Sequence, residues 1–258
     1  MRQVLQLTDG YDRCYSCAHL PAMLDAVAPI SYSVAHEQLH HALASYKRLS
    51  GEVARRLGLQ LAAVLWRYLA AHETCLVRAV GITASRRFHL VTTIPSGDRS
   101  RDEHHPLRWI VGEIVVPTRD RYERLLRRSD APVEHRTFDQ SKFDVIRPLG
   151  GQSVLLIDDM WTTGTNAQSA ATALKKAGAG AVAALVIGRH VNRDWRENDP
   201  RLKALAVPFD WSRCALCAPA LALRGDPSVG DGLADAPAPR LTVAEEYDLG
   251  VDRLDRVE

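Results

Sequence analysis

Residues 153–180 constrain the fold of this chain most, because they have the pattern of a buried strand, a tight turn and a helix. Val154 to Ile157 form an unbroken apolar run, which is typical of a strand covered on both faces. After the turn, alanines recur at helical spacing up to Ala177, and Gly178 stands where a glycine commonly ends a helix. The stretch therefore predicts a strand, a turn at 158–166 and a helix.

The predicted turn carries acids and small hydroxyl residues. Asp158 and Asp159 follow the strand directly and are acceptors suited to sugar hydroxyls. Backbone N–H groups at the start of a helix lack partners within the helix, and the helix dipole favours an anion there. Phosphate at one end and a diol at the other describe a ribose 5-phosphate. The candidate phosphate-binding residues are Thr162, Thr163, Gly164, Thr165 and Asn166.

This order of an apolar strand, Asp-Asp, two residues and Thr-Thr-Gly-Thr resembles the phosphoribosyl-pyrophosphate (PRPP) signature of type I phosphoribosyltransferases. The resemblance implies an α/β fold, with a mostly parallel sheet and helices on both faces. It implies that Asp158 and Asp159 hold the ribose hydroxyls in catalysis and that the loop Thr162 to Asn166 holds the 5-phosphate. It also implies Mg²⁺-assisted transfer of the phosphoribosyl group to a nitrogen acceptor, with release of pyrophosphate. The alternative is an ordinary strand-to-helix turn with a threonine N-cap.

A second candidate loop follows residues 88–97, which have the pattern of a strand ending at Pro95-Ser96-Gly97. Ligands of α/β sheets gather at the carboxyl ends of strands. The turn also resembles the pyrophosphate loop of the phosphoribosyltransferases. On that resemblance, Ser96 and Gly97 would meet the diphosphate and Arg99 or Arg101 would assist. Any strand-to-helix loop can share this pattern.

The cysteines predict a metal site. Two Cys-x-x-Cys pairs, Cys14/Cys17 and Cys214/Cys217, suggest one structural Cys₄ zinc site joining two distant parts of the chain. A redox pair, a disulfide and chance remain alternatives, and Cys75 is interpreted as a core residue. The predicted organisation is an N-terminal cysteine segment (1–30), a phosphoribosyltransferase domain (31–217) ending with the second cysteine pair, and a flexible linker and tail (218–258).

Composition fits a globular protein, with 46% hydrophobic and 25% charged residues over 258 positions. The net charge of +2 argues neither for nor against nucleic acid. No run is long and apolar enough to span a bilayer, and the first residues lack a signal-peptide core, so no membrane association and a cytoplasmic location are expected.

Two helices are predicted at 34–50 and 52–72. The first contains His36-Glu37-x-x-His40, formally a zincin signature, but a solvated helix face is the preferred interpretation because no third ligand stands at a recognised spacing. Residues 128–147 stand where phosphoribosyltransferases have a mobile closing loop. For the arginines of 119–136, a solvated surface and a functional role are equally open.

Within the family, the order of cysteine pair, helices, Pro-Ser strand end and signature is similar to the ComF-like, amidophosphoribosyltransferase-related branch. That branch carries both cysteine pairs near the N-terminus, whereas the second pair here follows the domain. Glutamine amidotransferase activity is not expected, because Met1 is followed by Arg2 and not by a cysteine. The alternatives to an active transferase are a non-catalytic PRPP- or nucleotide-binding regulator and a ComF-like accessory protein of DNA uptake. The acceptor is not identified, and a homodimer is possible.

Overall fold

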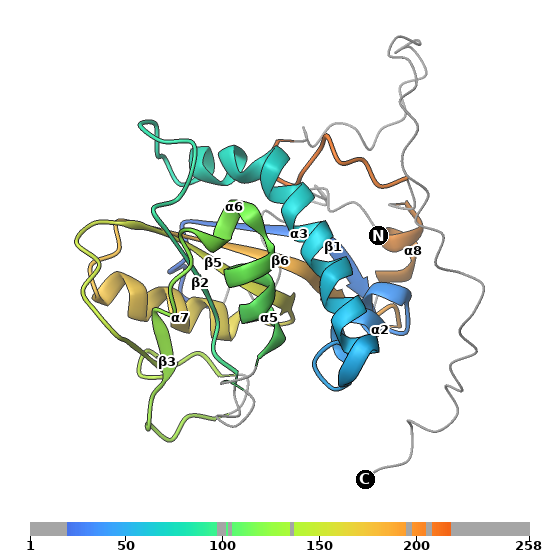
Figure 1. The fold of residues 1–258 in the computed structure, drawn as a ribbon, viewed down its shortest axis with the longest axis horizontal. Helices are drawn as coiled ribbons and strands as arrows, with labels where there is room; N and C mark the ends of the chain where they lie inside the picture. The colour runs from blue at the N-terminus through green and yellow to red at the C-terminus, as the bar shows by residue number, and fades with distance from the viewer. Residues whose placement is uncertain are drawn as a thin grey trace. The chain divides into compact units, whose positions relative to one another are not determined.

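In the described part of the chain, four parallel strands form the main sheet of an α/β fold, in the order β1-β6-β5-β2 (Figure 1). The strands are β1 (Ala26–Val34), β2 (Leu90–Thr93), β5 (Ser153–Trp161) and β6 (Ala181–Val191). The computed structural model describes residues 20–96, 102, 105–134, 137–194, 198–204 and 208–217.

Helices cover both faces of this sheet, as predicted (Figure 1). The alternating side chains of β5 explain the two layers. Leu155 and Ile157 pack in one apolar cluster with α3, whereas Val154 and Leu156 pack in the other with α7. The helices are α2 (Gln38–Ser45), α3 (Gly51–Ala79), α5 (Pro106–Trp109), the π-helix η1 (Ile110–Ile114), α6 (Val116–Arg119), α7 (Thr165–Lys176) and α8 (Asn198–Ala204).

The strand–turn–helix unit of residues 153–180 is confirmed. Strand β5 lies between β6 and β2, so both of its edges are hydrogen-bonded and both faces are covered. Helix α7 ends at Lys176, and Gly178 follows with a φ of 93°. That left-handed conformation favours glycine, which explains why the helix stops there.

The first strand corrects the prediction for the N-terminal third. The predictions assign residues 1–30 to the N-terminal cysteine segment and 34–50 to a helix, yet β1 occupies Ala26–Val34 and α2 begins only at Gln38. Pro29 obscured the strand because proline cannot donate to a ladder. Within the described sheet, β1 is an edge strand that pairs only with β6, so proline is tolerated there.

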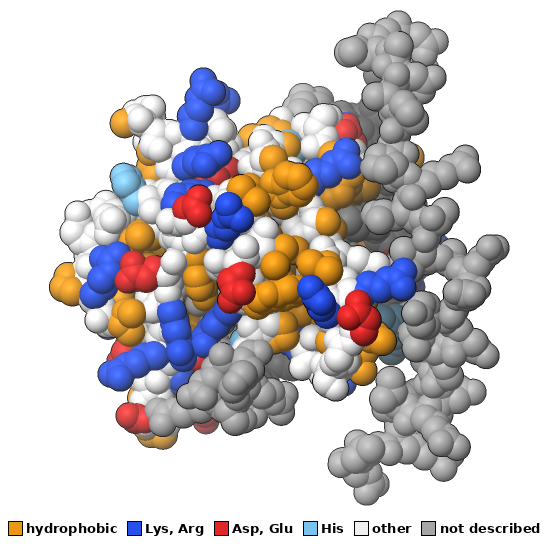
Figure 2. Space-filling model, viewed as in Figure 1, with side chains coloured by type: hydrophobic (Ala, Val, Ile, Leu, Met, Phe, Trp, Pro, Cys, Tyr) orange, Lys and Arg blue, Asp and Glu red, His pale blue; other side chains and the backbone are white. Residues whose placement is uncertain are grey.

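The second predicted helix is correct but longer than expected, because α3 spans Gly51–Ala79. Its buried face includes Leu65, Leu69 and Leu76. Trp66 on α3 and Val116 on α6 are exposed, and apolar and charged side chains intermingle on the face seen in Figure 2. No helix in the described ranges is long and apolar enough to cross a bilayer.

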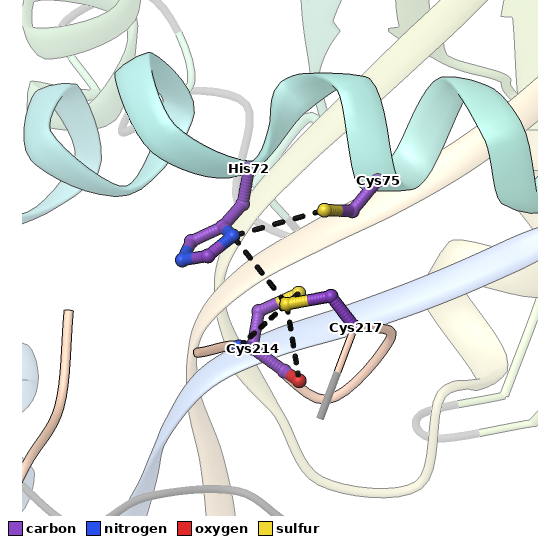
Figure 3. A group of neighbouring side chains, drawn as sticks. All are labelled: His72, Cys75, Cys214 and Cys217. Atoms are coloured by element: carbon purple, nitrogen blue, oxygen red, sulfur yellow. Dashed lines mark hydrogen bonds between the residues drawn. The ribbon is translucent and has the colours of Figure 1, made fainter. Parts of the chain in front are cut away.

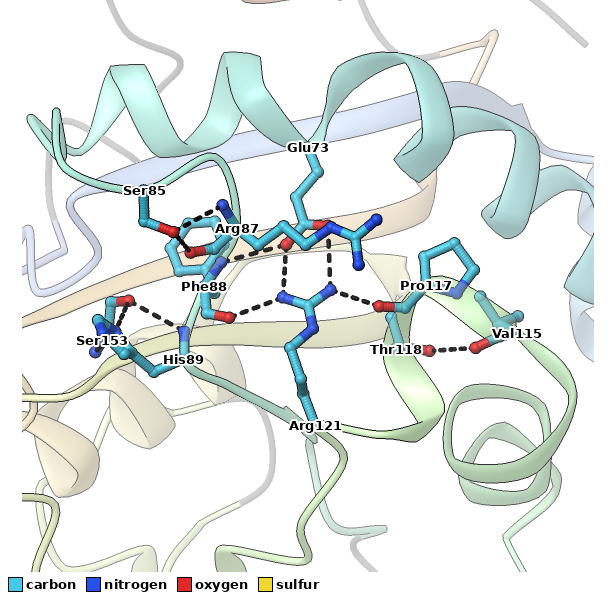
Figure 4. A network of polar contacts seen from close by, with 10 residues as sticks. All are labelled: Glu73, Ser85, Arg87, Phe88, His89, Val115, Pro117, Thr118, Arg121 and Ser153. Carbon is cyan, nitrogen blue, oxygen red and sulfur yellow. Dashed lines mark hydrogen bonds and ion pairs between the residues drawn. The ribbon is translucent and has the colours of Figure 1, made fainter.

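A buried ion pair links α3 to the residues just before β2 (Figure 4). Arg121 Nη1 and Nη2 donate to the two carboxylate oxygens of Glu73 at 2.6 and 3.0 Å, and Nη1 also donates to the Phe88 carbonyl at 2.7 Å. Glu73 is only 4% exposed. A planar guanidinium matches a carboxylate in this two-bond geometry. For Arg121, therefore, the structure favours a structural role.

A short antiparallel hairpin, β3 (Leu126–Arg128) and β4 (Phe143–Val145), stands apart from the main sheet. Residues 128–147, the predicted closing loop, include the last residue of β3 and all of β4. Within this loop, the Asp139 N–H donates to Ser169 Oγ of α7 at 3.0 Å. The predicted closing loop therefore contacts α7, and the mobility of the loop remains a prediction.

Candidate functional site

The parallel arrangement brings the carboxyl ends of all four strands to one edge of the sheet, where ligands of α/β folds bind. Asp158 and Asp159 lie at that end of β5. Successive side chains of a strand point to opposite faces, so the two carboxylates have different surroundings. Asp158 is partly buried and accepts the Asp159 N–H at 2.9 Å.

Asp159 is buried, with 2% of its surface exposed, and two residues at the end of α2 bind its carboxylate. The Tyr46 hydroxyl donates to Asp159 Oδ2 at 2.6 Å, and Lys47 Nζ lies 2.5 Å from the same oxygen. Sequence reasoning missed both residues. They stand 113 and 112 positions from Asp159, so no local spacing relates them to it.

The surroundings of Asp158 disfavour a negative charge on its carboxyl group. Burial, and then the charge of Asp159, raise the pKa of the Asp158 carboxyl. Burial and the adjacent Asp159 likewise raise the pKa of Tyr46, which keeps its hydroxyl protonated as a donor. The edge around Asp158 therefore favours a cation or a hydroxyl donor.

The signature loop begins α7 with a left-handed residue. Gly164 has a φ of 81°, and a Cβ at this position would lie 2.2 Å from Trp161 Cζ2. Two features therefore require glycine here, the backbone conformation and the adjacent indole. The N-cap residue Gly164 has no side chain to cap α7, and its carbonyl accepts the Gln168 N–H at 2.9 Å.

The loop threonines differ in exposure. Thr162 is exposed, Thr163 is partly buried, and Thr165 is buried. The hydroxyls of Thr163 and Thr165 are 3.1 Å apart, which holds the loop around the start of the helix. Asn166 is exposed in the first turn of α7. The positive end of α7 thus lies among hydroxyl groups, a suitable setting for a phosphate.

The end of β2 is organised by Asp102, which sequence reasoning also missed. The buried Asp102 carboxylate accepts the Ser96 N–H at 2.8 Å and an N–H of Arg124 at 2.9 Å, and it binds Arg108. The guanidinium groups of Arg108 and Arg124 therefore lie near Ser96, because all three residues bind the same carboxylate. Of the predicted pyrophosphate-loop residues, Gly97, Arg99 and Arg101 lie outside the described residues.

His105 is a further titratable group near this edge. Burial, followed by the charge of Lys47, lowers its pKa to about 4. Its Nδ1 accepts the Leu107 N–H at 3.3 Å and caps α5, so the ring is a neutral acceptor at neutral pH. The influence of Lys47 and Asp159 on the His105 pKa indicates that α2, β5 and the start of α5 converge here.

A separate cluster combines His72 and Cys75 of α3 with Cys214 and Cys217 (Figure 3). The four potential ligand atoms all lie within 4.8 Å of one another, so the cluster could hold a metal ion such as zinc. The interpretation of Cys75 as a core residue was incomplete, because it also belongs to this cluster. The signal available in the sequence was His72-x-x-Cys75, a spacing that places two ligands on one helix face.

The remaining predicted cysteines, Cys14 and Cys17, lie outside the described residues. The zincin-like motif does not form on one helix. His36 precedes α2 with a φ of 64°, and Glu37 forms an ion pair with Arg193 at 2.6 Å.

No family model, curated protein or solved structure matches this chain. The functional conclusion therefore rests on the residues of the site.

Proposed function

We propose that this chain is a phosphoribosyltransferase that binds PRPP at the carboxyl edge of its sheet and transfers the phosphoribosyl group to a nitrogen acceptor, releasing pyrophosphate. The observation that carries the proposal is the placement of Asp158 and Asp159 at the end of a buried parallel strand, directly before a glycine-centred loop that opens α7. A ribose 5-phosphate needs an acceptor and an anion site side by side, and this arrangement supplies both.

Two further features support the proposal. The sheet is parallel with helices on both faces, which agrees with the fold implied by the signature. Ser96 lies three residues after the end of the neighbouring strand β2, and the buried Asp102 binds its N–H together with Arg108 and Arg124. Cationic groups near a strand end suit a leaving diphosphate.

In the proposed reaction, the nitrogen of the acceptor forms a bond to C1′ of the ribose while the bond from C1′ to pyrophosphate breaks. The loop Thr162 to Asn166 would grip the 5-phosphate, and Asp158 would accept ribose hydroxyls. Asp159 would position Asp158 through its backbone N–H. These groups orient the ribose and stabilise the developing charge without bonding covalently to it.

Mg²⁺ is the metal implied with PRPP. It prefers oxygen ligands and often binds through one or two carboxylates plus substrate phosphates. The partly buried Asp158 carboxylate is the candidate ligand: burial, and then the charge of Asp159, raise its pKa, and a bound cation would favour its ionised form. When bound, the ion would offset charge on the diphosphate.

One observation favours a second candidate, a PRPP- or nucleotide-binding regulator without transferase activity. Lys47 and Tyr46 already bind the Asp159 carboxylate, so only Asp158 of the pair is open to a ribose. A regulator would need the phosphate loop but not the complete acidic pair.

Calorimetric titration with PRPP, with and without Mg²⁺, tests the proposal. We expect saturable binding that Asp158→Asn weakens by about 10- to 100-fold, since hydrogen bonds to a charged group contribute roughly 1.5–3 kcal/mol. Asp120→Asn removes the same charge from an exposed position at the end of α6 and should leave the affinity unchanged. Absence of binding to the folded wild-type protein would overturn the proposal.

Pyrophosphate release distinguishes the two candidates. With PRPP and a panel of nitrogen acceptors, a transferase releases pyrophosphate in proportion to acceptor and loses this activity in Asp158→Asn. A regulator binds PRPP with the same dependence on Asp158 but releases no pyrophosphate with any acceptor.

A further inference from the structure

The cluster of His72, Cys75, Cys214 and Cys217 combines two short ligand pairs from distant parts of the chain (Figure 3). His72 and Cys75 lie three residues apart on α3, so both side chains project from one face of the helix. Cys214 and Cys217 bracket a tight turn in which the Cys217 N–H donates to the Cys214 carbonyl at 3.2 Å. Each pair alone is unremarkable, but their convergence is specific.

The separations of the ligand atoms match a tetrahedral site. With Zn–S bonds of about 2.3 Å, neighbouring sulfurs of a tetrahedron lie about 3.8 Å apart. The Cys214 and Cys217 sulfurs are 3.3 Å apart, and His72 Nδ1 lies 3.7 Å from Cys75 Sγ and 3.8 Å from Cys217 Sγ. An ion at the centre therefore requires only small side-chain shifts.

The hydrogen bonding of His72 prepares its other nitrogen for a metal. His72 Nε2 lies 2.9 Å from the Trp211 carbonyl oxygen, which can only accept. Nε2 must therefore carry the proton, and the Nδ1 lone pair faces the sulfurs. A metal-bound histidine typically donates its other ring N–H to such an acceptor.

A backbone donor also faces one of the sulfurs. The Cys214 N–H lies 3.2 Å from Cys217 Sγ. An N–H directed at sulfur stabilises a thiolate, the form that binds metal. A disulfide between Cys214 and Cys217 would account for two of the sulfurs but not for the convergence of His72 Nδ1 and Cys75 Sγ on the same point.

We propose that His72, Cys75, Cys214 and Cys217 form a structural Zn²⁺ site that fastens the segment 208–217 to α3. One nitrogen and three sulfurs are a set that zinc favours, and four protein ligands leave no position for a substrate. Binding releases the protons of the three thiols to solvent and involves no change of oxidation state. The exposed Cys217 provides an access route for the ion.

The site would link α3 covalently, through the ion, to the last described segment of the α/β unit. The chain between Cys75 and Cys214 includes β2, β5 and β6. The ion would therefore cross-link the two ends of the segment that carries most of the candidate PRPP site. The attached segment has no helix or strand within 208–217, yet Phe209, Trp211 and Leu216 pack against the core. Metal binding supplies stability that backbone hydrogen bonds do not provide there.

Metal content of the reduced full-length protein tests the proposal. We expect one zinc per chain in the wild type and loss of that zinc in Cys75→Ser and in Cys217→Ser. The matched control is Cys14→Ser/Cys17→Ser, which should retain one zinc. Zinc lost in this control but retained in Cys75→Ser would overturn the proposal and assign the metal to the two Cys-x-x-Cys pairs.

Titration of metal-free wild-type protein with Co²⁺ removes any dependence on the folding of variants. A tetrahedral complex with three thiolates gives intense visible bands and a sulfur-to-metal charge-transfer band, and Zn²⁺ should displace it at one equivalent. Weak octahedral-type bands, or a thiol count showing a Cys214–Cys217 disulfide in the protein as isolated, would refute the site.

Discussion

Gly164 provides the sharpest test of how the signature loop is built. In Gly164→Ala, the φ of 81° puts an L-residue in the left-handed region, which costs about 1–2 kcal/mol. The new methyl group would also lie 2.2 Å from the Trp161 ring. Relief of such overpacking typically costs a further 1–3 kcal/mol or so. We therefore expect a loss of about 2–5 kcal/mol in the free energy of unfolding.

The matched control is Gly178→Ala at the other end of α7. Its φ of 93° imposes the same conformational cost, but the nearest atom to the new Cβ is 3.6 Å away, an ordinary contact. Urea unfolding measured by circular dichroism should give a larger loss for Gly164→Ala than for Gly178→Ala. Trp161→Leu added to Gly164→Ala should remove the steric part, measured as a coupling energy. Equal losses in the two alanine variants without coupling to Trp161 would refute the reasoning.

Three further predictions concern buried charges. The raised pKa of Asp158 means that the folded protein loses stability as pH rises through that pKa, so Asp158→Asn should be more stable than wild type at pH 9 by about 1–3 kcal/mol. Thermal melting should show that advantage shrinking toward pH 4, whereas a pH-independent difference would contradict it. Arg121→Met strands the buried Glu73 carboxylate and should cost about 3–5 kcal/mol in urea unfolding, partly recovered by adding Glu73→Leu. Tyr46→Phe removes a donor to Asp159 and should cost about 1.5–3 kcal/mol in the same assay; no loss would show that Lys47 alone satisfies the carboxylate.

The parts of the fold that were predictable are those encoded locally. Val154 to Ile157 and the alanines of α7 carry their periodicity within a few residues, so β5 and α7 could be recognised directly. Strand β1 was missed because Pro29 breaks the usual strand pattern, and its pairing with β6 involves residues more than 150 positions away. The local pattern could not reveal that β1 would lie at an edge, where proline is acceptable.

Of the candidate site, only the segment that runs from β5 into α7 could be predicted from the sequence. The acidic pair and the phosphate loop follow one strand, whereas the residues that bind or flank them come from elsewhere: Lys47 from the end of α2 and Asp102 from the loop after β2. The cysteine cluster has the same character. Cys214-x-x-Cys217 indicated a metal and His72-x-x-Cys75 has ligand spacing, but only the fold shows that the two pairs converge.

The two acids of the signature are not equivalent in this structure, and that difference bears on both candidate functions. Lys47 reaches Asp159 with a side chain that is 38% exposed, while the carboxylate itself is only 3% exposed. The partly exposed Lys47 side chain can move into solvent, whereas the buried Asp159 carboxylate cannot. A ligand that needs both acids must therefore displace Lys47 and the Tyr46 hydroxyl, whereas a ligand that needs one acid meets Asp158 directly. A transferase that used both carboxylates would therefore couple ribose binding to a shift at the end of α2, whereas a transferase that uses Asp158 alone, or a regulator, would need no such shift.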